Sequence, residues 1–333
     1  SVLICCLCFL LSACGSTIVA LPLDGTATPG GTSVSSTVTV SPTVTATLPG
    51  QASGCGNASP VKAGTTEQEA VPVDPQVSQG ATTRTYLLHV PVDYQPQLPL
   101  PLLLIFHGRG SNAAEIEGYS GFSQLADRER FIAVYPQGLP NADGEAFWDS
   151  FVPATAGIDE VAFVNIVLND VEQKLCVDTR RIDATGFSNG GNMTGMLACQ
   201  LANRIAAFAP IAGNFFDFKQ GCHPGRAVAL LNSHGTADDV VPYNGDNGRY
   251  GVQDWLEQWA ELDGCAADPI TFSQVSKVVA MQWTDCQEDV AIFHYRVLDE
   301  KHTWPKTLGN FPTDETIWRF FLAYSLPPTV QPH

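Results

Sequence analysis

The sequence predicts an α/β fold in which a mostly parallel sheet is flanked by helices on both faces. From about residue 75 onward, short apolar runs alternate with longer amphipathic runs, the pattern of strands alternating with helices. The run Leu-Leu-Leu-Ile-Phe at 102–106 has no polar alternation, so we expect that strand to be covered on both sides. With 333 residues, 44% of them hydrophobic, the chain is long enough for one large domain with appendages.

The expected elements follow one another in this alternation. Short apolar runs bounded by turn residues predict strands at 86–90, 102–106, 131–135, 181–185, 206–211, 228–232 and 291–297. Amphipathic runs predict helices at 113–127, 158–175, 190–202, 250–262 and 312–324. We expect a single domain at 75–327 and a tail at 328–333.

The charge balance excludes one class of partner. The chain has 17 Lys and Arg against 34 Asp and Glu, a formal net charge of −17. A surface this acidic repels a phosphate backbone. We therefore expect no nucleic-acid partner.

The amino terminus indicates export. Residues 2–11 form an apolar run that is long enough for the core of a signal peptide and too short to cross a bilayer as a helix. The following Leu11-Ser12-Ala13-Cys14 resembles a bacterial lipobox, which predicts that Cys14 is lipidated. We therefore expect 1–14 to be the remaining part of a signal peptide, with membrane contact only through a lipid anchor. An ordinary secretory signal cut near Ala13 is the alternative.

A flexible stalk is expected between this signal and the folded domain. Residues 15–53 are rich in Ser, Thr, Pro and Gly and carry one charged residue, Asp24. Such a segment cannot bury a core. We expect a stalk and lead-in over 15–74 and a monomeric protein.

Six cysteines remain once those in the leader are set aside. An even number in an exported protein predicts three disulfides, with fifteen possible connectivities. Cys265 and Cys286 flank a short segment and are expected to pair. Cys199 and Cys222 are both expected at the lower end of the sheet and to pair there, which leaves Cys55 for Cys176.

The sharpest motif is Gly186-Phe187-Ser188-Asn189-Gly190, a G-x-S-x-G sequence between a predicted strand and a predicted helix. In that context the motif is typical of a nucleophile elbow, in which a serine sits on a sharp turn. A serine that merely caps the helix is the alternative. A serine hydroxyl is a weak nucleophile, so Ser188 needs a histidine base and an acid that orients it.

Both partners occupy the expected places after later strands. Asp238 and Asp239 follow the strand at 228–232, and His302 follows the strand at 291–297. We favour Asp238 over Asp239, because the His-Gly-x-x-Asp form puts the first aspartate in the turn after the strand. The alternatives are a turn or cap residue for either aspartate and an exposed loop histidine for His302.

Backbone donors for an oxyanion are expected at two positions. Asn189 follows the nucleophile, and Arg109 follows His107-Gly108 at the end of the strand at 102–106, so their main-chain N–H groups are the predicted pair. His107 and His234 have no partner at metal-ligand spacing. We expect no metal and no cofactor.

Several separated segments together resemble the polyhydroxybutyrate depolymerase-like and feruloyl esterase family of α/β-hydrolases. They are 176–181 with 186–193, 234–243 and 302–305, and the likeness extends over roughly 75–325. The resemblance implies an α/β-hydrolase fold and extracellular carboxylic-ester hydrolysis by Ser188, Asp238 and His302 without a cofactor. The chain departs from the family pattern at two places, with Glu300-Lys301 before the histidine and Arg109 after His-Gly. Both departures bear on the shape of the acyl pocket.

The substrate is expected to be a polymeric ester. Because tryptophans are expected near the site, we favour a hydroxycinnamoyl ester of plant polysaccharide such as xylan. Trp304 follows the predicted base, and Trp148 and His107 lie near strand ends, so we expect all three to contact substrate. An aromatic wall favours a flat acyl group. Polyester depolymerase, acetyl-xylan esterase, a non-catalytic binding module and a peptidase of the same fold are the alternatives.

The lipid anchor is testable. A doubly or triply acylated cysteine anchors a protein stably, so Cys14→Ser should move the protein from the membrane fraction to the medium when the full-length precursor is expressed in a bacterium. Equal release of the wild type and the variant would contradict lipidation.

Overall fold

The computed structural model describes residues 50–328, except 152–153, 216–220 and 247–248. The expected signal segment with Cys14, most of the expected stalk and all but the first residue of the expected tail lie outside the described residues. In the part of the chain that is described, no helix is both long enough and apolar enough to span a bilayer.

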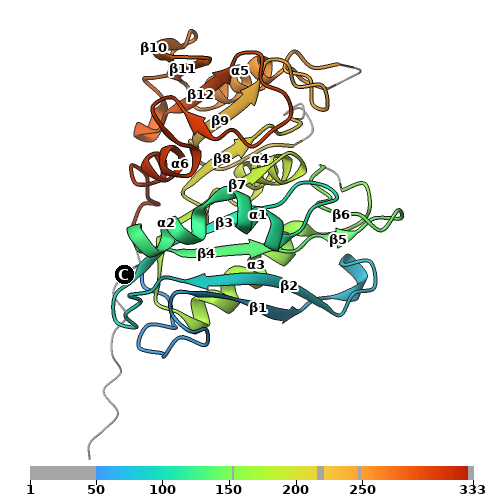
Figure 1. The fold of residues 1–333 in the computed structure, drawn as a ribbon, viewed down its shortest axis with the longest axis vertical. Helices are drawn as coiled ribbons and strands as arrows, with labels where there is room; N and C mark the ends of the chain where they lie inside the picture. Colours follow the sequence, from blue (N-terminus) through green and yellow to red (C-terminus); the bar gives the residue numbers. More distant parts are fainter. Residues whose placement is uncertain (1–49, 152–153, 216–220, 247–248, 329–333) are drawn as a thin grey trace, which may run out of the picture. The chain divides into compact units, whose positions relative to one another are not determined.

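Ten strands form one sheet in the order β1-β2-β4-β3-β7-β8-β9-β12-β11-β10 (Figure 1). The six strands from β4 to β12 in this order are parallel to their neighbours. Two antiparallel strands extend the sheet at each side. The bounds are β1 Thr65–Pro72, β2 Thr83–Val90, β3 Leu100–Phe106, β4 Ile132–Pro136, β7 Val177–Phe187, β8 Ala207–Ile211, β9 Ala229–Gly235, β10 Ile270–Val275, β11 Val278–Trp283 and β12 Ile292–Val297.

Helices cover both faces of this sheet. Leu102, Leu104 and Phe106 of β3 pack into a core with α3 (Glu160–Lys174), α4 (Asn189–Gln200) and α5 (Val252–Leu262). Leu103 and Ile105 face a second core with α1 (Ala113–Ser120), α2 (Phe122–Glu129) and α6 (Thr313–Phe321). In Figure 1, α1 and α2 lie in front of the strands and α3 behind them. The apolar run at 102–106 is therefore buried on both sides, as its composition predicts.

The remaining elements are short. Two hairpins pair β5 (Leu139–Pro140) with β6 (Ala146–Phe147) and β13 (Thr307–Leu308) with β14 (Phe311–Pro312). The 3₁₀ helices are η1 (Pro75–Val77) and η3 (Gln287–Asp289).

The predicted strands and helices are all present, with three differences. The expected helix at 113–127 is broken at Gly121, whose φ of 81° ends α1 and starts α2 in a new direction. Strand β1 lies within the expected lead-in, so the folded domain begins before residue 75. Strands β10 and β11 were not predicted. Most residues of β1 and β10 are exposed or half-buried, because edge strands have one unpaired side and need little apolar sequence.

Three disulfides tie the loops to this frame. They join the pairs expected from the sequence, Cys55–Cys176, Cys199–Cys222 and Cys265–Cys286. The first fastens the segment before β1 to the start of β7. In the chain-entropy model a bridge that closes a loop of this length contributes about 4 to 5 kcal/mol.

A buried ion pair connects β2 to the start of α3. Arg84 Nη1 lies 2.7 Å from Glu160 Oε2, and both side chains are fully buried. The Arg84 guanidinium also lies 3.6 Å from the centre of the Phe163 ring. Glu160 Oε1 accepts a hydrogen bond from the Asp149 N–H at 3.2 Å. The pair thereby helps to hold the loop that contains Trp148.

Removing one partner of this pair should destabilise the protein. Glu160→Gln leaves the Arg84 charge buried without a counter-ion, which costs about 3 to 5 kcal/mol. Urea unfolding measures the loss, with Lys277→Gln as control because Lys277 and its partner Asp299 are largely exposed. Equal unfolding midpoints for the two variants would show that the buried pair contributes nothing.

Candidate active site

Ser188 occupies the sharp turn between β7 and α4. It is the single residue between the last residue of the strand and the first of the helix. Its backbone has φ 56° and ψ −118°, a region that residues with a side chain rarely adopt. The turn therefore has the strained geometry of a nucleophile elbow.

The flanking glycines permit this turn because the backbone passes close to its neighbours. A Cβ at Gly190 would lie 2.0 Å from the carbonyl oxygen of Phe106, and one at Gly186 would lie 2.3 Å from the carbonyl oxygen of Gly190. Any side chain at either position would collide with backbone. The two outer glycines of G-x-S-x-G are thus required, because β3 and α4 pack too closely against this turn to leave room for a side chain.

One chain of hydrogen bonds joins Ser188, His302 and Asp238. Ser188 Oγ lies 2.8 Å from His302 Nε2, and His302 Nδ1 lies 2.8 Å from Asp238 Oδ2. Asp238 lies in the turn after β9, and His302 lies in the loop after β12. The parallel strands β7, β9 and β12 end at the same edge of the sheet and bring the three residues together.

The structure distinguishes the two neighbouring aspartates. Asp238 is buried and its Oδ1 accepts the N–H groups of Val240 and Val241 at 3.0 and 2.7 Å. Asp239 lies in solvent, where its carboxylate meets Lys301 at 3.2 Å. Only Asp238 contacts the histidine.

The surroundings of Asp238 keep its carboxylate ionised. Burial by itself would raise the pKa of Asp238, but hydrogen bonds from His234 and His302 and from the Val241 N–H outweigh it and hold the pKa well below its ordinary value. A negative charge is therefore present beside His302 throughout the neutral pH range. It can orient the ring and stabilise an imidazolium.

The main chain on which the two oxyanion donors are expected lies close to Ser188. Asn189 is the first residue of α4, and the first N–H groups of a helix have no acceptor within it. Gly108, which precedes Arg109, lies against the serine, since a Cβ there would be 3.4 Å from Ser188 Cβ. The Arg109 side chain pairs with Glu145 at 2.8 Å and is mostly exposed; the role of its main-chain N–H as second donor stays a prediction.

The expectation that Trp148 and His107 contact substrate is wrong, because both are fully buried. Trp148 Nε1 donates to the His107 carbonyl at 2.9 Å, and the Trp148 ring packs on Phe106. His107 Nε2 accepts from the Gly138 N–H at 3.0 Å. Burial lowers the pKa of His107, so its ring stays neutral. These two side chains support the loops around the site from within.

Asn189 has a second role that the sequence did not indicate. Its Oδ1 accepts the Trp148 N–H at 2.7 Å, and its Nδ2 donates to the Trp148 carbonyl at 3.0 Å. This double contact fastens the loop at 146–150 to the residue after the nucleophile.

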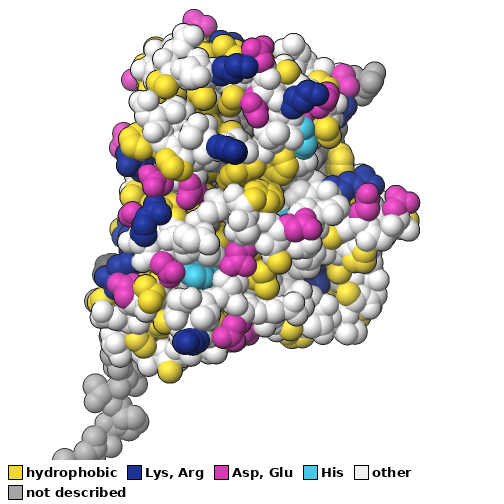
Figure 2. Space-filling view, in the orientation of Figure 1, with side chains coloured by type: hydrophobic (Ala, Val, Ile, Leu, Met, Phe, Trp, Pro, Cys, Tyr) yellow, Lys and Arg dark blue, Asp and Glu magenta, His cyan; other side chains and the backbone are white. Residues whose placement is uncertain are grey.

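Trp304 belongs to a half-buried aromatic group beside the histidine. Its ring centre lies 6.1 Å from that of Tyr119 and 6.4 Å from that of Phe187, and Phe187 lies 5.0 Å from the His302 ring. Phe187 and Tyr119 were not anticipated, although Phe187 is part of the G-x-S-x-G motif. Figure 2 shows hydrophobic side chains gathered in a hollow across the middle of one face, with charged side chains around it.

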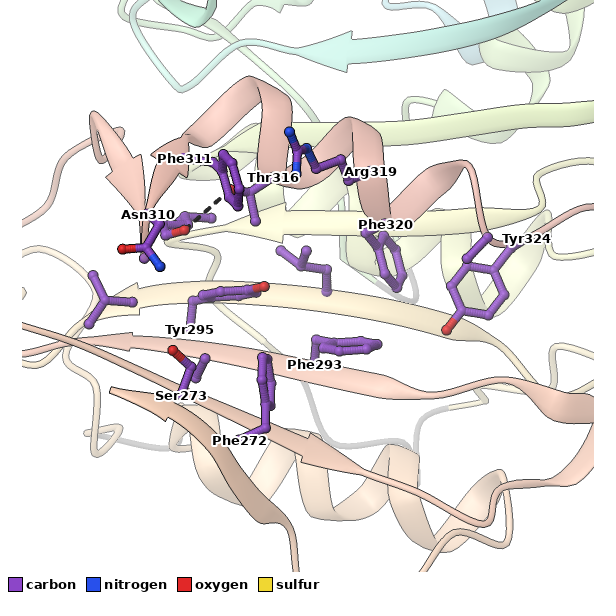
Figure 3. A pocket seen from close by; sticks show the side chains of 16 residues that line it. Phe272, Ser273, Phe293, Tyr295, Asn310, Phe311, Thr316, Arg319, Phe320 and Tyr324 are labelled. Atoms are coloured by element: carbon purple, nitrogen blue, oxygen red, sulfur yellow. Dashed lines mark hydrogen bonds between the residues drawn. The ribbon is translucent and has the colours of Figure 1, made fainter. Parts of the chain in front are cut away.

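A separate apolar groove of about 340 Å³ lies between α6 and the strands β10 to β12 (Figure 3). Its aromatic lining consists of Phe272, Phe293, Tyr295, Phe311, Phe320 and Tyr324. Ser188, Asp238 and His302 do not line it, so it is distinct from the hydrogen-bonded site.

Within the described ranges, no group of three or more His, Cys, Asp or Glu side chains is placed to bind a metal ion.

The arrangement is suited to nucleophilic acyl transfer, and reactivity toward a fluorophosphonate probe can test it. Ser188 should be labelled in the wild type, because His302 can take the proton of its hydroxyl. Asp238→Asn should slow labelling by several orders of magnitude, and Asp239→Asn should leave it near the wild-type rate. Mass spectrometry of labelled peptides gives the site and the rate. The reverse ranking of the two variants would assign the acid to Asp239.

Comparison with known proteins places the chain among esterases. No protein-family model matches it. It is 31% identical to feruloyl esterase B of Piromyces equi over 201 residues, which are 56% of this chain and 37% of that protein. It is 29% identical over 209 residues, 61% of this chain, to the bifunctional acetylxylan esterase/xylanase XynS20E of Neocallimastix patriciarum, of which it covers 29%. The chain thus spans about a third of the length of these two relatives.

The match to a third relative covers most of both proteins. Feruloyl esterase C of Emericella nidulans is 30% identical over 250 residues, 72% of this chain and 84% of that protein. Among solved structures, an acetyl xylan esterase from Aspergillus awamori superposes with a TM-score of 0.56 at 17% identity, over 77% of this chain and 98% of that chain. That likeness supports the fold. The chain belongs to the feruloyl esterase family of α/β-hydrolases.

Proposed function

We propose that this protein is a serine carboxylic-ester hydrolase that releases hydroxycinnamoyl groups from plant cell-wall polysaccharide such as xylan. The observation that carries the proposal is the continuous contact from Ser188 Oγ through His302 to Asp238, built on a strained elbow. An intact set of this kind favours an enzyme over a binding module that keeps only the fold. The named activity of the feruloyl esterase relatives supports the choice of substrate.

The geometry supports a two-step reaction. His302 Nε2 takes the proton of Ser188 as Oγ attacks the ester carbonyl, and Asp238 stabilises the resulting imidazolium. The N–H groups of Asn189 and Arg109 stabilise the negative charge that develops on the carbonyl oxygen. The tetrahedral intermediate then collapses, the bond from the carbonyl carbon to the sugar oxygen breaks, and the imidazolium gives its proton to that oxygen, so that the sugar leaves as an alcohol. A water molecule, activated by the same histidine, hydrolyses the acyl-enzyme and restores Ser188.

The aromatic group beside His302 supports an aromatic acyl substrate. Trp304, Phe187 and Tyr119 pack against one another beside His302, and we assign this group to the wall that receives the acyl group. Tyr119 is 43% exposed, so the group is open to a ligand. Offset stacking of a cinnamoyl ring contributes about 0.5 to 1.5 kcal/mol beyond area burial. An acetyl or short hydroxyacyl group gains much less from such contacts.

We infer that the enzyme works outside the cytoplasm. Three disulfides fit an oxidising compartment. A lipid at Cys14, with the segment rich in Ser and Thr as spacer, would hold a monomeric catalytic domain at the outer face of a bacterial membrane.

Substrate preference provides the test. Wild type should have a higher kcat/KM for methyl ferulate than for methyl 3-hydroxybutyrate or methyl acetate, and Trp304→Ala should lower that ratio by about 3- to 10-fold. Ser188→Ala should lose ester turnover by about a thousandfold or more. Phe311→Ala, in the separate groove, is the matched control for loss of an exposed aromatic ring. A ratio unchanged by Trp304→Ala, or a wild type that prefers the aliphatic ester, would favour the acetyl-xylan or polyester alternative.

A further inference from the structure

A second imidazole contacts the same carboxylate oxygen of the acid as His302 does. His234, near the end of β9, has its Nε2 3.1 Å from Asp238 Oδ2 and 2.9 Å from the Val241 carbonyl oxygen. The same Oδ2 atom meets His302 Nδ1 at 2.8 Å. The side chains of His234 and Asp238 are both fully buried. One carboxylate oxygen thus lies between two histidines.

The contacts of His234 fix its tautomer. Two acceptors, a carboxylate oxygen and a carbonyl oxygen, face Nε2, so this nitrogen carries the hydrogen. The other nitrogen, Nδ1, is buried and has no hydrogen-bond partner among the described residues. The hydrogen on Nε2 is therefore directed at the Asp238 carboxylate and the Val241 carbonyl.

We propose that His234 is a positioning residue of this site, which donates Nε2–H to Asp238 Oδ2 and so holds the carboxylate ionised and aimed at His302. The inference rests on the proposed esterase function. The Val240 and Val241 N–H groups hold Oδ1, and His234 is the fixed donor to Oδ2. Without it, Oδ2 would keep a single side-chain donor among the described residues, His302 Nδ1. Asp238 would then be a buried charge with one donor fewer, a state that favours uptake of a proton.

Two other ionisable side chains near His234, those of Tyr243 and His294, keep the same charge state between pH 5 and 9. Tyr243 and His294 form a hydrogen bond of 2.7 Å behind its ring. Burial raises the pKa of Tyr243 to about 12 and lowers that of His294 to about 3, so both are neutral between pH 5 and 9. Arg296 is the register partner of His234 on the neighbouring strand β12. On the solvent side lies the exposed pair of Lys301 and Asp239.

The test is the pH profile of kcat/KM for p-nitrophenyl acetate. His234→Leu removes the donor and keeps an apolar volume, whereas His234→Gln can place an amide N–H near the position of Nε2. We expect His234→Leu to lower kcat/KM about 10- to 100-fold, the effect of losing one hydrogen bond to a charged group. We also expect the acid limb of the profile to move to higher pH, because the pair of Asp238 and His302 binds its proton more tightly when the anion loses a donor. His234→Gln should restore both quantities in large part.

A matched control comes from another buried histidine. His89 Nε2 also meets an aspartate, Asp127 Oδ1 at 3.2 Å, but on β2, away from the site. His89→Leu should lower the melting temperature and leave the acid limb in place. A His234→Leu protein that is folded, with the acid limb of the wild type, would overturn the proposal. So would a His234→Gln protein that behaves like His234→Leu.

Two further comparisons keep the outcome clear. If His234→Leu does not fold, His234→Asn replaces it, because the shorter amide cannot reach the position of Nε2 while the longer one in His234→Gln can. Wild type and Ser188→Ala are measured first on the same ester. An inactive wild type would overturn the proposed function, whereas an active wild type whose acid limb is unmoved in the His234 variants would overturn only the role of His234.

Discussion

The close approach of β3, β7 and α4 at the two glycines of the elbow is the constraint from which the site follows. The Gly190 backbone rests on the carbonyl of Phe106, at the end of β3, and Ser188 N–H donates to the Ile211 carbonyl of β8 at 2.9 Å. A serine at φ 56° costs on the order of 1 to 3 kcal/mol in strain. Backbone contacts from both neighbouring strands hold it there. The same packing places Asn189 at the helix start and Gly108 against the serine, so the nucleophile and the expected oxyanion donors share one scaffold.

The loop at 146–150 connects this scaffold to a buried polar network. Asp149 accepts hydrogen bonds from the N–H groups of Thr155, Ala156 and Ile158, and its own N–H donates to Glu160. Glu160 in turn pairs with Arg84 on β2. Trp148 lies between this network and Asn189. A short series of direct contacts thus joins the ion pair to the residue that follows Ser188.

The polar and the aromatic parts of the site lie on different sides of His302. On one side Asp238 accepts from His302 and His234 in a buried, hydrogen-bonded setting. On the other side Phe187 packs against the imidazole and leads to Trp304 and Tyr119. This division suits the proposed reaction, in which charge develops toward the aspartate while a flat acyl group occupies the apolar side. At Arg109, where the chain departs from the family pattern, the side chain is mostly exposed and pairs with Glu145.

The sequence by itself determined the elements whose signal is local. Strands buried on both faces need continuous apolar runs, the elbow needs glycines at fixed spacing, and the order of Ser188, Asp238 and His302 follows from which loops end parallel strands. The cysteine pairs could also be inferred from their positions along these elements. Tertiary structure decided what depends on distant neighbours. Edge strands β1 and β10 bury few of their side chains, so they have no continuous apolar run like those of the central strands. Nothing local separates a tryptophan that packs on Phe106 from one that faces a ligand, so only the packed structure could bury Trp148 and His107 and leave Trp304 half-open. The sequence favours Asp238 over Asp239, but the contact with His302 that distinguishes the two carboxylates, and the donation from His234 to the same oxygen, required three loops to meet at one edge of the sheet.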